Sequence, residues 1–139
     1  MGTEQLKSDD EAAPEWPRRR ISIVDDDAAI REALKGLMRS ARYPVDVFAS
    51  AEEFLDRANM DEVACLILDI RLPGISGIQL RDRLKTDRRR IPIIFISAHA
   101  DEVSRDKVLK NGAVELLSKP VRRESLFKAI QAAIAPKAE

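Results

Sequence analysis

The sequence is poor in cysteine and has no excess charge of either sign. Its one cysteine, Cys65, lies inside an apolar stretch, where it is expected to pack as a small hydrophobic residue. The 24 basic residues balance the 24 acidic ones, so no overall field draws the chain to nucleic acid. No apolar run approaches the roughly 20 residues that a membrane helix needs. We expect a cytoplasmic domain that binds neither membrane nor, directly, nucleic acid.

The N-terminal segment lacks the apolar core of a secretory signal. Its polar, small and proline residues predict a disordered leader over residues 1–19. Residues 20–135 are long enough for one domain with one core, and residues 136–139 are expected to form a short C-terminal tail. The sequence therefore predicts a single folded domain.

Within residues 20–135, short apolar runs alternate five times with segments of helical periodicity. The expected strands are residues 21–24, 43–49, 63–68, 91–96 and 113–117. The first helix shows the pattern well, with apolar residues at Ile30, Leu34, Leu37 and Met38. Such alternation predicts an α/β fold, a parallel sheet covered by helices on both faces. Right-handed crossovers favour the flavodoxin-like strand order 2-1-3-4-5.

Polar side chains follow four of the five expected strands. Asp25 and Asp26 follow the first strand, Asp69 ends the third, Ser97 ends the fourth, and Lys119 follows the fifth. These four strands are neighbours in the order 2-1-3-4-5, and ligands of open α/β sheets bind at the carboxyl ends of the strands. We therefore expect the five side chains to meet at one edge of the sheet.

Three clustered carboxylates would raise one another's pKa unless a cation joined them. Mg²⁺ suits a site with few carboxylates and room for water and phosphate. One carboxylate could then act as a nucleophile toward phosphorus. The Lys119 ammonium and the Ser97 hydroxyl would stabilise the equatorial phosphoryl oxygens. This set of residues indicates the chemistry of an aspartyl phosphate.

The same residues lie in blocks that resemble a known family. The blocks are Ile23-Val24-Asp25-Asp26-Asp27, Leu68-Asp69-Ile70-Arg71-Leu72-Pro73-Gly74, Ile96-Ser97-Ala98 and Lys119-Pro120. In order and spacing over residues 20–135, they resemble the receiver domains of bacterial response regulators, which have a CheY-like fold. The sequence around Asp69 and over residues 50–55 is most similar to that of the FixJ/NarL type.

The resemblance implies a role for each residue. Asp69 would be the phosphoacceptor, Ser97 the switch hydroxyl and Lys119 the counter-charge of the phosphoryl group. Asp26 would bind Mg²⁺ directly, Asp25 largely through water, and Arg71 through its backbone carbonyl. Family members often have a cis bond at the position of Lys119-Pro120. Such a protein would catalyse only its own phosphorylation and slow dephosphorylation.

The resemblance also implies partners. A sensor histidine kinase or a histidine phosphotransfer protein would supply the phosphoryl group. The face made by the fourth helix, fifth strand and fifth helix would form a homodimer or contact an output partner. One position departs from the family pattern, since Leu116 stands where an aromatic residue usually reports the switch. Arg71 and His99 would flank the path of the hydrolytic water.

Two other classes of protein share part of this pattern. A phosphatase of the haloacid-dehalogenase kind also carries Asp-x-Asp, Ser and Lys, but it needs an acidic pair after the lysine, where only Glu124 is near. A degenerate receiver used purely for protein binding would have lost acidic residues, and none is lost here. The sequence leaves open whether the chain is a stand-alone receiver or the receiver half of a DNA-binding regulator.

Overall fold

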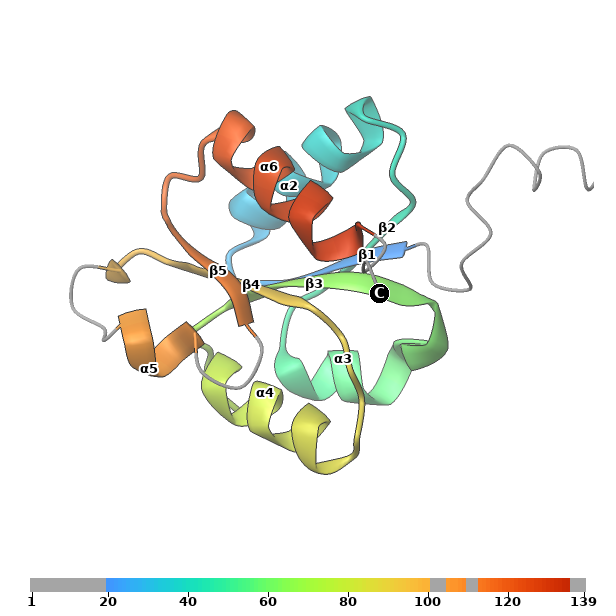
Figure 1. The fold of residues 1–139 in the computed structure, drawn as a ribbon, viewed down its shortest axis with the longest axis vertical. Helices are drawn as coiled ribbons and strands as arrows, with labels where there is room; N and C mark the ends of the chain where they lie inside the picture. Colours follow the sequence, from blue (N-terminus) through green and yellow to red (C-terminus); the bar gives the residue numbers. More distant parts are fainter. Residues whose placement is uncertain (1–19, 101–104, 110–112, 136–139) are drawn as a thin grey trace, which may run out of the picture.

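Five parallel strands form one sheet in the order β2-β1-β3-β4-β5 in the computed structural model of the protein, which describes residues 20–100, 105–109 and 113–135 (Figure 1). The strands are β1 (Arg20–Val24), β2 (Val45–Phe48), β3 (Val63–Asp69), β4 (Ile93–Ser97) and β5 (Ala113–Ser118). The helices are α2 (Ala28–Ser40), α3 (Ala51–Arg57), η1 (Met60–Glu62), α4 (Gly77–Thr86), α5 (Arg105–Leu109) and α6 (Arg123–Ile134). The predicted fold class and strand order are confirmed.

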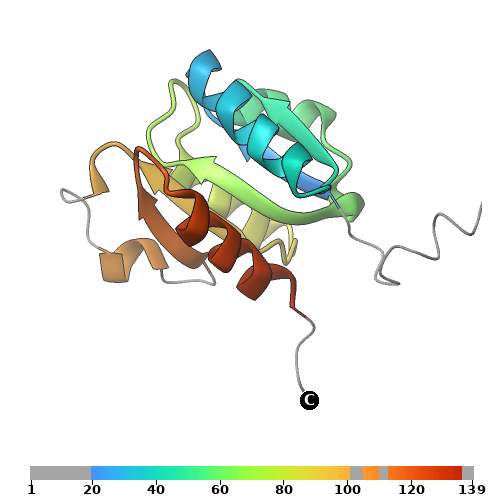
Figure 2. The same ribbon diagram turned by 90° about the horizontal axis from the view of Figure 1, so that it is seen from above.

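Helices cover both faces of the sheet. Helices α2 and α6 lie on one face, and α3 and α4 lie on the other (Figures 1 and 2). Helix α5 packs beside β5 at the edge of the sheet. This layering follows from right-handed crossovers between parallel strands. The direction in which the chain moves to its next strand sets the face of the sheet on which the connecting helix lies.

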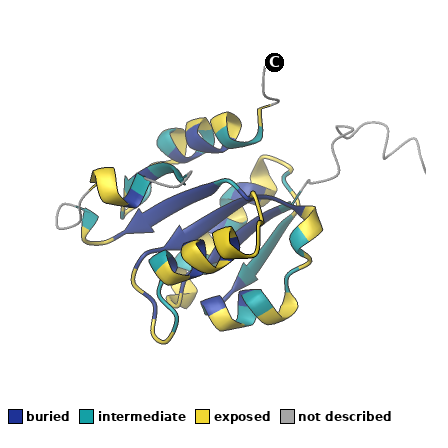
Figure 3. Cartoon of the chain, turned by 60° about the horizontal axis from the view of Figure 1, so that its bottom comes forward, coloured by how far each residue is buried: buried dark blue, intermediate teal, exposed yellow. Residues whose placement is uncertain are grey.

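The central strand β3 explains why the core has two halves. All seven of its residues are buried, and its side chains alternate between the two faces. Leu66 and Leu68 join the apolar cluster under α3, α4 and α5, whereas Cys65 and Ile67 join the cluster under α2 and α6. Burial is concentrated in the strands, while the helices keep exposed outer faces (Figure 3). A continuous apolar run is what burial on both faces requires.

The start of α3 is capped differently from the prediction. The sequence predicts a reciprocal capping box between Ser50 and Glu53. Ser50 Oγ does accept a hydrogen bond from Glu53 N (3.0 Å), but the Glu53 carboxylate accepts from Ala49 N (2.7 Å). The glutamate side chain reaches one residue further back, where the chain leaves β2. A full capping box forms instead between Ser76 and Gln79 at the start of α4.

Some predictions fall on residues that the structure does not describe. These are the leader over residues 1–19, the tail over residues 136–139, the start of the fourth helix at Asp101, and its cap at Asn111 and Gly112. In the described ranges, no helix combines the length and the apolar character needed to cross a membrane.

Candidate functional site

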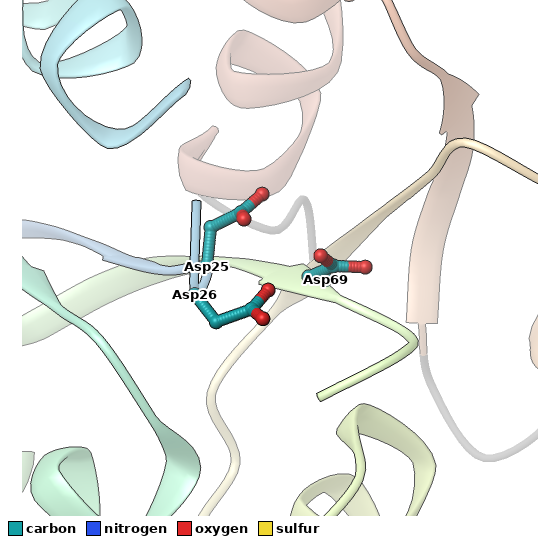
Figure 4. A group of neighbouring side chains, drawn as sticks. All are labelled: Asp25, Asp26 and Asp69. Carbon is teal, nitrogen blue, oxygen red and sulfur yellow. The ribbon is translucent and has the colours of Figure 1, made fainter. Parts of the chain in front are cut away.

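Three carboxylates gather at the carboxyl ends of β1 and β3 (Figure 4). Asp25, Asp26 and Asp69 each offer an oxygen, and these oxygens all lie within 4.8 Å of one another. Asp25 and Asp69 are buried, whereas Asp26 is exposed. The strands β1 and β3 are neighbours in the sheet, so their ends bring together residues that are more than 40 positions apart. This cluster could hold a metal ion.

Two hydrogen bonds, one from the loop after β1 and one from α2, hold Asp25 in place. Asp25 Oδ1 accepts a hydrogen bond from the backbone amide of Asp27 (2.9 Å). The side chain of Asp27 in turn caps α2, accepting from the amides of Ala29 and Ile30. Arg31, in the second turn of α2, donates from Nη1 to the backbone carbonyl of Asp25 (2.8 Å). The start of α2 and the acidic pair are therefore one structural unit.

Lys119 lies between the two buried carboxylates. Its Nζ is 2.8 Å from Asp25 Oδ2 and 2.9 Å from Asp69 Oδ2. The contact with Asp69 is a hydrogen bond, whereas the contact with Asp25 is an ion pair without that geometry, since Asp25 Oδ2 has no hydrogen-bond partner among the described residues. The peptide bond between Lys119 and Pro120 is cis, as expected from the resemblance.

The charges in this cluster are not balanced. Burial raises the pKa of Asp69; the hydrogen bond from Lys119 lowers it, but the charge of Asp25 raises it further. For Lys119, burial lowers the pKa, yet the carboxylates of Asp25 and Asp69 outweigh this and raise it above its usual value. A single ammonium group therefore does not compensate two buried carboxylates. A site with excess negative charge favours an additional cation.

The residue types also fit a hard divalent cation. Asp25 Oδ2 is buried, and the Lys119 ammonium that lies 2.8 Å from it is shared with Asp69. Carboxylate oxygens are the ligands that Mg²⁺ and Ca²⁺ prefer. The exposed Asp26 leaves one side of the cluster open to water. The three aspartates therefore fit a metal site.

Asp69 is tied to the loop that follows it. Its Oδ1 accepts a hydrogen bond from the backbone amide of Arg71 (3.0 Å), and the amide of Ile70 continues the pairing with β4 through Ile96 O (3.1 Å). Gly77, the first residue of α4, donates from its amide to Ile70 O (2.9 Å). The end of β3 and the start of α4 thus fix the position of the Asp69 backbone.

The neighbouring strands place the other predicted residues at the same edge. Ser97 ends β4 and is buried; its Oγ accepts from the amide of His99 (2.9 Å), and its carbonyl accepts from the amide of Lys119 (2.9 Å). Arg71 and His99, in the loops that follow β3 and β4, are exposed. Leu116 is buried in the core under α5, so it differs from an aromatic residue that alternates between water and protein.

Reasoning from the sequence missed two residues near the site. Arg31 contacts the backbone of Asp25, as described above, and Glu52 contacts the loop after Asp69, since its Oε2 accepts from the amide of Ile75 (3.0 Å). Both are charged residues in the early part of a helix, where charged side chains are common. Nothing in a single sequence separates them from ordinary surface residues.

Comparison with known proteins identifies the family. A model of the response regulator receiver domain matches residues 21–131. Response regulator protein TodT of Pseudomonas putida is 46% identical over 114 residues, which are 82% of this chain and 50% of that protein. Transcriptional regulatory protein FixJ of Bradyrhizobium diazoefficiens is 37% identical over 114 residues, which are 82% of this chain and 56% of FixJ. The solved structure of FixJ-N is similar with a TM-score of 0.77 and 30% identity, over 87% of this chain and 97% of FixJ-N.

The chain belongs to the response regulator receiver domain family, which acts in two-component signalling. This is the family that the sequence blocks resemble, and the similarity to FixJ confirms the expected type. Receiver domains interact with kinases and output domains. The chain spans about half the length of TodT and FixJ.

Proposed function

We propose that this chain is a phosphoacceptor receiver that takes a phosphoryl group on Asp69, with Mg²⁺ bound, and switches conformation. The observation that carries the proposal is the cluster of Asp25, Asp26 and Asp69 with Lys119 between its two buried members. The family membership supports the same function.

In the proposed reaction, a carboxylate oxygen of Asp69 forms a bond to phosphorus, and the bond from phosphorus to the donor nitrogen of a phosphohistidine breaks. When bound by Asp25, Asp26, Asp69 and the Arg71 carbonyl, Mg²⁺ would neutralise the charge that develops on the phosphoryl oxygens. Lys119 supplies a second positive charge, already within hydrogen-bonding distance of Asp69. Ser97 supplies a hydroxyl from the neighbouring strand end.

The proposed donor of the phosphoryl group is a sensor histidine kinase or a histidine phosphotransfer protein. The cytoplasmic location is likewise a prediction.

The proposed output surface is the face of α5, β5 and α6, which are the fourth helix, fifth strand and fifth helix of the fold. Arg105 joins α5 to β5, donating to Leu116 O (3.2 Å) and to both carboxylate oxygens of Glu115 (2.9 and 2.8 Å). Arg81 of α4 donates to Val108 O at the other end of α5 (2.8 Å). These contacts tie α5 to the sheet and to α4.

Incubation with acetyl phosphate and Mg²⁺, followed by mass spectrometry, tests the proposal. Wild-type protein should carry one acid-labile phosphate on Asp69, and Asp69→Asn should carry none. Without Mg²⁺, Asp69→Asn should be at least as stable as wild type, because it removes a buried charge that faces Asp25. Phosphate on the variant at wild-type yield would show that another residue is the acceptor.

A further inference from the structure

The side chain of Glu52 joins α3 to the loop between β3 and α4 (residues 70–76). Glu52, the second residue of α3, accepts a hydrogen bond at Oε2 from the backbone amide of Ile75 (3.0 Å). The two residues are 23 positions apart. The contact thus joins two segments that the chain itself does not hold together.

The loop is shaped to admit this carboxylate. Gly74 has a φ of 74°, a conformation that L side chains adopt at a cost. A Cβ atom added at Gly74 would collide with Oε2 of Glu52. The loop therefore lacks a side chain at the position where the carboxylate of Glu52 lies.

Glu52 is not needed to start α3. Ser50 caps the helix by accepting from the amide of Glu53, and the Glu53 carboxylate accepts from the amide of Ala49. An acidic residue in a first turn also interacts favourably with the helix dipole, and that effect requires only negative charge. The hydrogen bond to Ile75 is a separate contact, and a neutral acceptor of the same shape could make it.

The two ends of the loop are held by other contacts. At its start, the amide of Arg71 donates to Asp69 Oδ1. At its end, the amide of Gly77 donates to Ile70 O, and Ser76 forms the capping box of α4. Glu52 contacts the loop between these ends, and Ile75 lies four residues after Arg71. We expect movement of the loop at Ile75 to be passed along these four residues to the Arg71 backbone.

We propose that Glu52 is a positioning residue of the phosphorylation site, which holds the loop of residues 70–76 so that the Arg71 carbonyl stays within reach of Mg²⁺ at the aspartate cluster. This inference rests on the proposed function. Glu52 itself touches neither the metal nor the phosphoryl group. Its effect is on the affinity for Mg²⁺, through the conformation of the loop.

Three variants test the proposal: Glu52→Ala, Glu52→Gln and the control Asp56→Ala. Asp56 is exposed on the same helix, so its removal changes the charge of α3 equally. Glu52→Ala should weaken Mg²⁺ binding about three- to tenfold by calorimetry, since a hydrogen bond of this kind contributes on the order of a tenfold factor or less. It should also speed amide exchange at Ile75. Glu52→Gln, which keeps an acceptor oxygen, and Asp56→Ala should stay near wild type.

At saturating Mg²⁺, Glu52→Ala should reach the wild-type yield of phosphorylation, because its defect is one of affinity. Equal Mg²⁺ affinity of Glu52→Ala and Asp56→Ala would overturn the inference, and so would a defect in Glu52→Gln as large as in Glu52→Ala. If wild-type protein is phosphorylated and Glu52→Ala matches it at all Mg²⁺ concentrations, only this inference fails. If wild-type protein binds no Mg²⁺, the proposed function fails together with it.

Discussion

The substitution Gly77→Ala places an atom against the backbone of the candidate phosphoacceptor. Gly77 begins α4, and its amide already donates to Ile70 O. A Cβ at this position would collide with the carbonyl oxygen of Asp69 and come too close to Ile70 Cα. These are backbone atoms at the end of a strand whose seven residues are all buried, so no side chain can rotate away. The end of β3 or the start of α4 must move.

The size of the effect follows from two opposing contributions. Overpacking of a well-packed region costs about 1–3 kcal/mol. Alanine is favoured over glycine in a helix by about 0.5–1 kcal/mol, and less of this gain applies in the first turn. The variant should therefore lose about 1–2 kcal/mol of unfolding free energy. For a domain of this size, that corresponds to a fall in Tm of roughly 5 °C.

A second glycine provides a matched control. Gly36 lies within α2, and a Cβ added there would meet no described atom within 4 Å apart from its chain neighbours and the backbone of its own helix. Gly36→Ala should therefore gain about 0.5–1 kcal/mol from helix propensity alone. Thermal and urea unfolding followed by circular dichroism would compare the two variants, and phosphorylation by acetyl phosphate would report the site. Gly77→Ala should also be phosphorylated more slowly than wild type, whereas Gly36→Ala should not.

Two results would refute this reasoning. A Gly77→Ala variant as stable as wild type and phosphorylated at the same rate would show that α4 does not lie against the Asp69 backbone. A similar rise in Tm for both variants would show that helix propensity decides the outcome and the collision does not occur.

Three further predictions follow from the site and the core. Asp26→Ala should weaken Mg²⁺ binding and stop phosphorylation, and unchanged Mg²⁺ affinity by calorimetry would place the metal elsewhere. Beryllofluoride with Mg²⁺ should cause large NMR shifts at Ala98 and His99 but little change at the Leu116 methyl groups, because Leu116 is already buried; a Leu116 rotamer change as large as the loop movement would contradict this. Burial raises the pKa of the Cys65 thiol to about 12, so iodoacetamide should modify native protein very slowly near neutral pH and guanidinium-unfolded protein quickly. Rapid modification of the native protein would show that β3 is accessible.

The sequence alone predicted the fold and the edge of the sheet at which the polar residues meet. Strands and helices follow from apolar periodicity, which is local, and right-handed crossovers then limit the strand order. Asp25, Asp69 and Lys119 could be placed at one edge because each lies at or just past the end of a strand. Cys65 could be placed in the core because the run around it is apolar on both faces of β3.

Tertiary structure decided which of these groups touch and how they are held. That Lys119 lies within 3 Å of both Asp25 and Asp69 depends on the path of the chain after β5. The contact of Glu52 with Ile75 depends on the turn at Gly74, and the reach of Glu53 to Ala49 depends on how the chain leaves β2. The contacts of Lys119 and Glu52 join segments that are distant in the sequence. The contact of Glu53 differs from the predicted one only in which backbone amide, that of Ala49 or that of Ser50, the carboxylate accepts from. Their distances arise only when the packed sheet and helices set the backbone positions, so periodicity and residue type do not encode them.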